Sequence, residues 1–149
     1  RAMAAYDATR RPSMETLAAD TRAALERFFA ALTARDTAAA EACLADGARL
    51  VSDGGGEFRA ALRPVVGAGH VTRFFLGLAR KLGLPSRFDV RSMNGLPALV
   101  VEYEDHPRPA NGPARAWARR FVVRCDVDAR GLIEEVHVLL ASPKLARVR

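Results

Sequence analysis

Apolar residues recur at helical spacing in three stretches of the first half of the chain. From Ser13 onward they fall three and four positions apart and predict an amphipathic helix, with Ser13 placed to cap its first turn. A second helix is predicted from Asp36 to Asp46-Gly47, with Leu44 on its inner face. A third is predicted from Val71 to Leu82. The apolar positions of the first helix are Leu17, Ala24, Leu25, Phe28, Phe29 and Leu32.

Beyond Pro85 the pattern changes from helical spacing to alternation, which is typical of strands. Asn94-Gly95 is a strong hairpin signal between the first two of these strands. Two further strands are predicted from Trp117 to Val127 and from Leu132 to Ala141. One short strand, from Ala48 to Ser52, is predicted among the helices.

This order of elements predicts an α+β domain, with about three N-terminal helices packed on one face of a curved, mainly antiparallel sheet. A strongly bent sheet closed by helices forms a cone with an interior pocket. The 149 residues suit one domain over residues 13–149, and residues 1–12 read as a linker or tail. We expect no membrane association, because no apolar run approaches the roughly 20 residues of a spanning helix.

Charge is the compositional feature that changes this picture, since the formal net charge is +6. Between Arg59 and Arg91 there are seven basic residues and one acid, Asp89, so this segment equals the whole net charge. It is either a solvated face or a docking face for an acidic protein surface. Cys43 and Cys125 lack metal-binding spacing and are expected to be small buried residues of a cytoplasmic protein.

Four segments carry a resemblance to a known family. The first two are Leu50-Val51-Ser52-Asp53-Gly54-Gly55-Gly56, followed by Arg59-Ala60-Ala61-Leu62-Arg63-Pro64-Val65, and Arg73-Phe74-Phe75-Leu76-Gly77-Leu78. The others are Asn94-Gly95-Leu96-Pro97-Ala98 and Ser142-Pro143-Lys144-Leu145-Ala146. The chain resembles the C-terminal SnoaL-like extension of certain extracytoplasmic function (ECF) sigma factors. These extensions belong to the nuclear transport factor 2-like superfamily.

The resemblance implies a cone fold and a regulatory function in the bacterial cytoplasm, without a cofactor. The domain would dock on sigma regions 2 and 4 of the same polypeptide and thereby act on RNA polymerase. Residues 1–12 would be the exit from region 4, and DNA would be contacted only through the sigma regions. The residues implied in docking are Asp53, Gly54, Gly55, Gly56, Glu57, Arg59, Arg63, Asn94, Gly95, Pro97, Lys144 and Leu145.

The glycine run after Asp53 has three readings. Consecutive backbone N–H groups can cradle a phosphate, but the Lys-Ser/Thr of a phosphate-binding loop is missing. A plain turn is the second reading, and a contact loop that meets the sigma domains is the third and favoured one. Glu57 stands where the family usually has Lys, so the detailed interface is expected to differ there.

Four residues are candidates to line the interior of the cone, namely His70, Tyr103, Trp117 and His137. They do not form a clean set of converging acid and base groups, so no catalytic residue is assigned and the chain is not expected to be an enzyme. Two alternatives remain: a stand-alone isomerase, cyclase or epoxide hydrolase, or a ligand-sensing domain for a small apolar molecule. His137 either faces outward or is a lone pocket residue.

Two further expectations concern metals and self-association. Glu102, Glu104 and Asp105 lie beside His106, but carboxylates on an exposed strand edge are usually only solvated, so no metal is expected. Sheets of this superfamily often dimerise. An exposed strand face carrying Trp117 and Phe121 would allow a homodimer.

Overall fold

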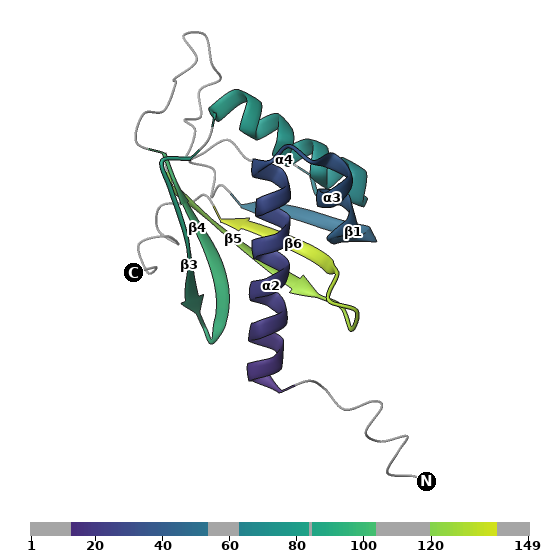
Figure 1. The fold of residues 1–149 in the computed structure, drawn as a ribbon, viewed down its shortest axis with the longest axis vertical. Coiled ribbons are helices and arrows are strands. Elements are labelled where there is room, and N and C mark those ends of the chain that lie inside the picture. Colours follow the sequence, from purple (N-terminus) through teal and green to yellow (C-terminus); the bar gives the residue numbers. More distant parts are fainter. Residues whose placement is uncertain (1–12, 54–62, 84, 104–119, 140–149) are drawn as a thin grey trace.

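The computed structural model describes residues 13–53, 63–83, 85–103 and 120–139 of the chain. Within these ranges it contains three helices, α2 (Met14–Thr33), α3 (Thr37–Ala42) and α4 (Ala68–Leu82). The strands are β1 (Leu44–Asp53), β2 (Val65–Val66), β3 (Arg87–Met93), β4 (Leu96–Glu102), β5 (Arg120–Val127) and β6 (Ile133–Leu139). The helices cover one face of the sheet, with α2 lying across the strands (Figure 1).

Helix α2 forms as its sequence pattern predicts. The backbone N–H of Thr16 donates to Ser13 Oγ at 3.1 Å, which satisfies one of the free amides of the first turn. The helix buries one apolar stripe, which includes Ala24, Leu25 and Phe28, each no more than 1% exposed. This stripe anchors α2 to the sheet.

The second predicted helix is real but shorter than its sequence pattern indicates. Asp36 caps α3 by accepting from the N–H of Ala39 at 3.0 Å, as expected. The helix ends at Ala42 rather than at Asp46, however, and Leu44 is the first residue of a ten-residue strand. The physical reason is long-range pairing, because the carbonyl of Cys43 accepts from Ile133 N–H at 2.9 Å and Leu44 pairs with Ile133.

Helix α4 and the β3–β4 hairpin agree with the predictions, although α4 starts three residues earlier, at Ala68. Gly83 adopts a positive φ of 72° after its last turn, as a C-terminal glycine does. At the hairpin tip both Asn94 (φ 53°) and Gly95 (φ 81°) lie in the left-handed region, which identifies a type I′ turn.

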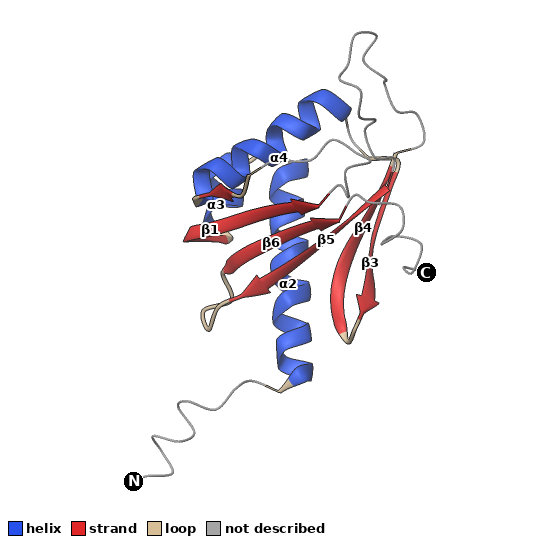
Figure 2. Ribbon diagram, turned by 180° about the vertical axis from the view of Figure 1, so that it is seen from behind, coloured by secondary structure: helices blue, strands red, loops and turns tan. Residues whose placement is uncertain are grey.

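The sheet has the strand order β2-β1-β6-β5-β4-β3. Antiparallel pairs dominate, but β1 pairs with β6 in parallel, with Leu50 opposite Val136. The run of four antiparallel strands predicted from sequence is confirmed, whereas the parallel pair and the two-residue strand β2 were not anticipated. The sheet twists so that β3 and β4 run across the direction of β1 and β6 (Figure 2).

The main core lies between the helices and the covered face of the sheet. Leu99, Val123 and Val136 from three adjacent strands pack there against α2 and α4. Cys125 is buried as expected, but Cys43 is only half-buried and donates its thiol proton to the carbonyl of Ala39. No helix in the described ranges combines the length and hydropathy that a membrane span requires.

Candidate functional site

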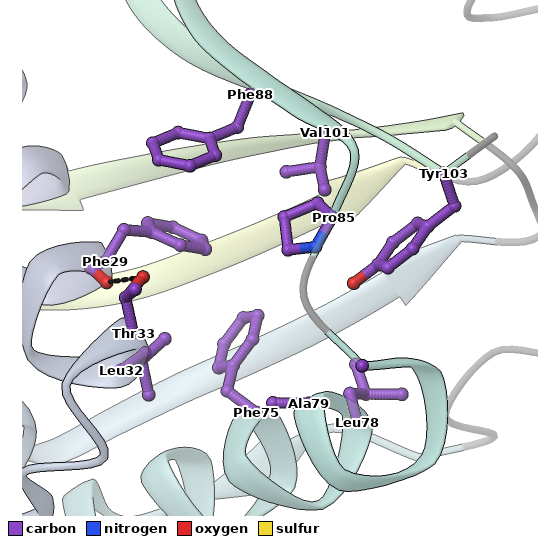
Figure 3. Close-up of a pocket in the computed structure, with 11 residues that line it drawn as sticks. Phe29, Leu32, Thr33, Phe75, Leu78, Ala79, Pro85, Phe88, Val101 and Tyr103 are labelled. Carbon is purple, nitrogen blue, oxygen red and sulfur yellow. Dashed lines mark hydrogen bonds between the residues drawn. The ribbon is translucent and has the colours of Figure 1, made fainter. Parts of the chain in front are cut away.

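An apolar pocket opens between α2, α4 and the β3–β4 pair (Figure 3). The volume that water-sized molecules can enter is about 70 Å³. This is less than half of the ~150 Å³ of an engineered cavity that binds benzene. Phe88 is 55% exposed, so one aromatic wall of the pocket reaches solvent. The lining residues are Phe29, Leu32, Thr33, Phe75, Leu78, Ala79, Gly83, Pro85, Phe88, Val101 and Tyr103.

An aromatic cluster shared by α2 and α4 builds the inner wall. Phe75 of α4 meets Phe28 and Phe29 of α2 edge to face, with ring centroids 5.5 Å and 6.0 Å away. Phe28 itself is 1% exposed and fixes the distance between the helix and the sheet. Such edge-to-face packing holds rings in defined orientations, so this wall is rigid.

Two hydroxyl groups are the polar side-chain features of the lining. The Thr33 hydroxyl donates to the carbonyl of Phe29 at 2.9 Å. Tyr103 stacks on Phe121 and points its hydroxyl end toward Pro85 and Leu78 (Figure 3). Burial raises the pKa of Tyr103 above its ordinary value, so the phenol stays protonated and can donate a hydrogen bond.

The described lining contains no carboxylate, imidazole or guanidinium group. General acid–base catalysis most often uses a carboxylate or an imidazole, although a tyrosine phenol such as that of Tyr103 can also transfer a proton. The described lining therefore presents an apolar surface with one phenol that could orient a small molecule by a hydrogen bond.

The pocket candidates from sequence separate in space. Tyr103 lines the pocket, whereas Trp117 lies outside the described residues. His70 is exposed on α4, where its Nδ1 lies 2.9 Å from the carbonyl of Val66 and donates to it. His137 lies on the other face of the sheet, because its neighbours Val136 and Val138 face the main core. It therefore faces outward and is not a pocket residue.

On that outer face His137 sits between two acids. Its Nε2 is 3.4 Å from both Asp126 Oδ2 and Glu135 Oε1. Arg124 pairs with His137 across β5 and β6 and places a positive charge on the same side of the sheet. The group is half-exposed, and we interpret it as a surface ion-pair cluster.

The outer face also holds a small apolar cluster. Ala98, Val100 and Val122 are no more than 1% exposed there, and Leu139 packs against them. Phe121 does not belong to this face, because it points into the main core and is 7% exposed. The prediction that Phe121 lies on an exposed strand face is therefore wrong, because the alternation of β5 directs its side chain toward the helices.

The residues implied in docking are also spread over the sheet. Asn94 and Gly95 are exposed at the hairpin tip, but Pro97 is buried. Arg63 is exposed just before β2, and Asp53 ends β1. The other implied residues lie outside the described ranges, namely Gly54, Gly55, Gly56, Glu57, Arg59, Lys144 and Leu145.

Register places the end of β1 and the hairpin tip at opposite ends of the sheet. Asp53 pairs with Leu139, which pairs with Val122 at the start of β5. The tip instead lies beside the start of α2, because a Cβ placed on Gly95 would meet Met14 Cε at 3.6 Å. The described docking candidates therefore lie on two separate surfaces, one at the end of β1 and one at the hairpin tip.

Sequence reasoning missed most of the pocket because its apolar residues satisfy the helix and strand patterns equally well. Phe29, Phe75 and Leu78 lie on predicted inner helix faces, and nothing in their spacing separates a cavity wall from a filled core. Phe88, the second residue of β3, is marked as a pocket residue only by its exposure in the structure, which the sequence does not show.

In the described ranges three helices lie on one face of a twisted, mostly antiparallel six-stranded sheet, with an apolar pocket between α2, α4 and the β3–β4 pair, and this arrangement is an α+β cone fold. Neither a scan against protein-family models nor a comparison with curated proteins finds a match to this sequence.

Solved structures match the fold at low sequence identity. The extracytoplasmic function sigma factor SigJ of Mycobacterium tuberculosis aligns with a TM-score of 0.67 and 22% identity, over 85% of this chain and 44% of that chain. The chain thus spans less than half the length of that sigma factor. A nuclear transport factor 2-like protein from Burkholderia xenovorans LB400 aligns with a TM-score of 0.54 and 14% identity, over 87% of this chain and 95% of that chain.

A candidate isomerase of the SnoaL-like family from Agrobacterium tumefaciens str. C58 aligns with a TM-score of 0.53 and 14% identity. The alignment covers 82% of this chain and 97% of that chain. At these identities the likeness shows the fold. The fold therefore occurs both in free-standing proteins and as part of a longer sigma factor.

Proposed function

We propose that this chain is the regulatory C-terminal domain of an ECF sigma factor, and that it docks on sigma regions 2 and 4 to modulate transcription initiation. The observation that carries the proposal is the alignment with SigJ, in which 85% of this chain matches only 44% of that one. The remainder of a protein of that kind would supply the polymerase-binding and promoter-reading regions.

The composition of the pocket supports a regulatory rather than a catalytic function. Its described lining offers two hydroxyl groups but no carboxylate, imidazole or amine, the groups that most often transfer protons in catalysis. The free hairpin tip supports docking as well, because Asn94 and Gly95 lie beside the start of α2, where a preceding domain would enter.

Transcription by core RNA polymerase with the full-length protein tests this function. Deletion of residues 13–149 is expected to change transcript yield. The paired substitution Gly54→Pro/Gly55→Pro and a deletion from Ser142 are expected to shift the yield in the same direction. The matched control is Gly47→Ala, because a Cβ at Gly47 meets nothing within 4 Å. Unchanged yield after removal of the whole domain would overturn the proposal, as would a reading frame that begins at this domain.

A second function has its own support, since the pocket combines aromatic walls with one buried phenol. A ligand that binds there and favours one docking state would regulate the domain. Phenol and benzene are suitable probes, because the pocket is open to solvent beside Phe88 and need not enclose the whole ring, and because the two compounds differ by one hydroxyl. We expect phenol to raise the melting temperature more than benzene does, and Tyr103→Phe to remove the difference. Absence of any stabilisation by either compound would argue against a ligand site.

A further inference from the structure

Helix α4 carries a basic ridge on the side opposite its core face. We define the basic ridge as Arg73, Arg80 and Lys81 together with Gly77, which lies between them at three- and four-residue spacing. The three basic side chains are exposed, and no acidic residue occurs between Ala68 and Leu82. Figure 1 shows α4 at one margin of the described part of the molecule.

Gly77 is the unexplained member of this ridge. Glycine in the middle of a helix is unfavourable relative to alanine because it loses more backbone freedom on folding. Gly77 does not have a positive φ, and a Cβ placed on it would meet nothing within 4 Å. Neither the backbone nor packing within the described chain requires glycine here. Its effect is to leave a low point between Arg73 and Arg80, where another backbone can approach α4 closely.

Apolar side chains border the basic ridge on both sides. Phe74 and Leu76 pack against the main core but remain half-exposed on either flank of Gly77. The basic ridge therefore presents a line of positive charge with apolar side chains along both borders, so a partner could pair its charges with the ridge and pack against Phe74 and Leu76. The Arg73 guanidinium is held along the helix because its Nε donates to the carbonyl of Gly69 at 3.3 Å.

We propose that the basic ridge docks an acidic helix of sigma region 2 or 4, whose backbone approaches α4 at Gly77. This inference rests on the proposed function and names the surface through which docking occurs. Charge complementarity selects the occupant: a second copy of the chain carries a net charge of +6 and would be repelled. A nucleic acid would be attracted by the cations, but its phosphate backbone would gain nothing from the open space at Gly77 or from contact with the apolar Phe74 and Leu76.

The test uses the full-length protein in the same transcription assay. We expect Arg73→Glu/Arg80→Glu to move transcript yield most of the way to that of the domain deletion. Arg73→Gln/Arg80→Gln should give a smaller shift in the same direction, without placing negative charge near the helix C-terminus. The matched control is Arg22→Glu/Arg130→Glu, which changes the net charge equally at exposed positions away from α4.

Gly77→Ala separates docking from stability. Because the space is open, alanine should raise the melting temperature of the domain, yet it should shift transcript yield toward that of the deletion. A change in yield together with higher stability cannot arise from misfolding.

Three outcomes would overturn the inference, and they differ from one another. If the domain deletion changes yield while the ridge variants match the control, the ridge is wrong and the proposed function stands. If the deletion itself has no effect, the proposed function fails and the ridge docking fails with it. If this chain binds a labelled DNA duplex and Arg73→Glu/Arg80→Glu abolishes that binding, the ridge is a nucleic-acid surface.

Discussion

At the scale of single residues, Thr72 stands out because its hydroxyl group is buried without a hydrogen-bond partner in the described part of the chain. Its side chain is 0% exposed, and Oγ1 has no hydrogen-bond partner within the described part of the chain. A buried hydroxyl that has lost its water without gaining a partner costs about 1–3 kcal/mol. Valine has the same shape without this cost.

We therefore expect Thr72→Val to raise the free energy of unfolding by about 1–2 kcal/mol in urea denaturation. Thr21 is the matched control, since it is also buried but donates to the carbonyl of Leu17 at 2.7 Å. Thr21→Val loses that hydrogen bond and should be neutral or destabilising. Equal effects of the two substitutions would contradict the explanation.

Cys125 makes a prediction about alkaline pH. Burial, with a smaller contribution from the negative charge of Asp126, raises the pKa of its thiol from 9.0 to about 12. Above pH 9.0 the unfolded chain releases a proton that the folded chain keeps, so stability falls as pH rises from there toward 12. The loss from this group is at most about 1.4 kcal/mol per pH unit.

Urea denaturation at several pH values above 9.0 measures this slope. Cys125→Val removes the thiol and should make the decline shallower, leaving the contributions of Cys43 and Tyr103, whose pKa values burial also raises. An unchanged slope in Cys125→Val would show that this thiol is not the titrating group.

At the scale of elements, the hairpin turn depends on a glycine that adopts a positive φ without strain. Gly95 has a φ of 81°, and a Cβ there would also meet Met14 Cε at 3.6 Å. Gly95→Ala is expected to lower the free energy of unfolding by about 1–2 kcal/mol, because a side chain is disfavoured at this φ. Gly47→Ala, in open space, should change it by less than about 0.5 kcal/mol. Urea denaturation of both variants makes the comparison, and similar values would contradict it.

Local chemistry explains which elements could be predicted from sequence. The Asn94-Gly95 turn, the Ser13 cap and the apolar stripe of α2 each act over a few residues, so their signals survive in the sequence. The end of α3 could not be predicted in this way. Leu44 fits the helical pattern but pairs instead with Ile133, which lies far along the chain. Strand β2 has two residues, too few to show alternation.

At the scale of the whole molecule, the aromatic cluster joins the helices to the sheet. Phe28 meets Phe29 and Phe75 edge to face and is 1% exposed, whereas Phe74 is half-exposed at the edge. Phe28→Ala is expected to cost about 3–5 kcal/mol, and Phe74→Ala clearly less. Calorimetry should show one cooperative transition at a lower temperature for Phe28→Ala. Equal losses for the two variants would contradict a core centred on Phe28.

The pocket belongs to this scale as well, and that is why most of it escaped prediction. Its walls come from α2, α4, β3 and β4, so the cavity exists only through their relative placement. Tyr103 was anticipated because it is a polar aromatic residue that continues the inward-facing alternation of Leu99 and Val101. Phe75 and Leu78 are apolar residues at ordinary inward-facing helix positions, so their sequence pattern does not distinguish a pocket wall from a filled core.

The position of β6 has a consequence for the order of folding. The last strand of the described chain lies between β1 and β5, so the sheet stays in two pieces until residue 139 has been synthesised. The β3–β4–β5 meander can form early from local contacts. Strand β1 has an early partner in the two-residue β2, but its longer pairing must wait for β6, which is made about eighty residues later. During translation the facing edges of β1 and β5 would therefore stay unpaired until β6 is made, which makes this interval the period of greatest exposure to aggregation and to chaperones.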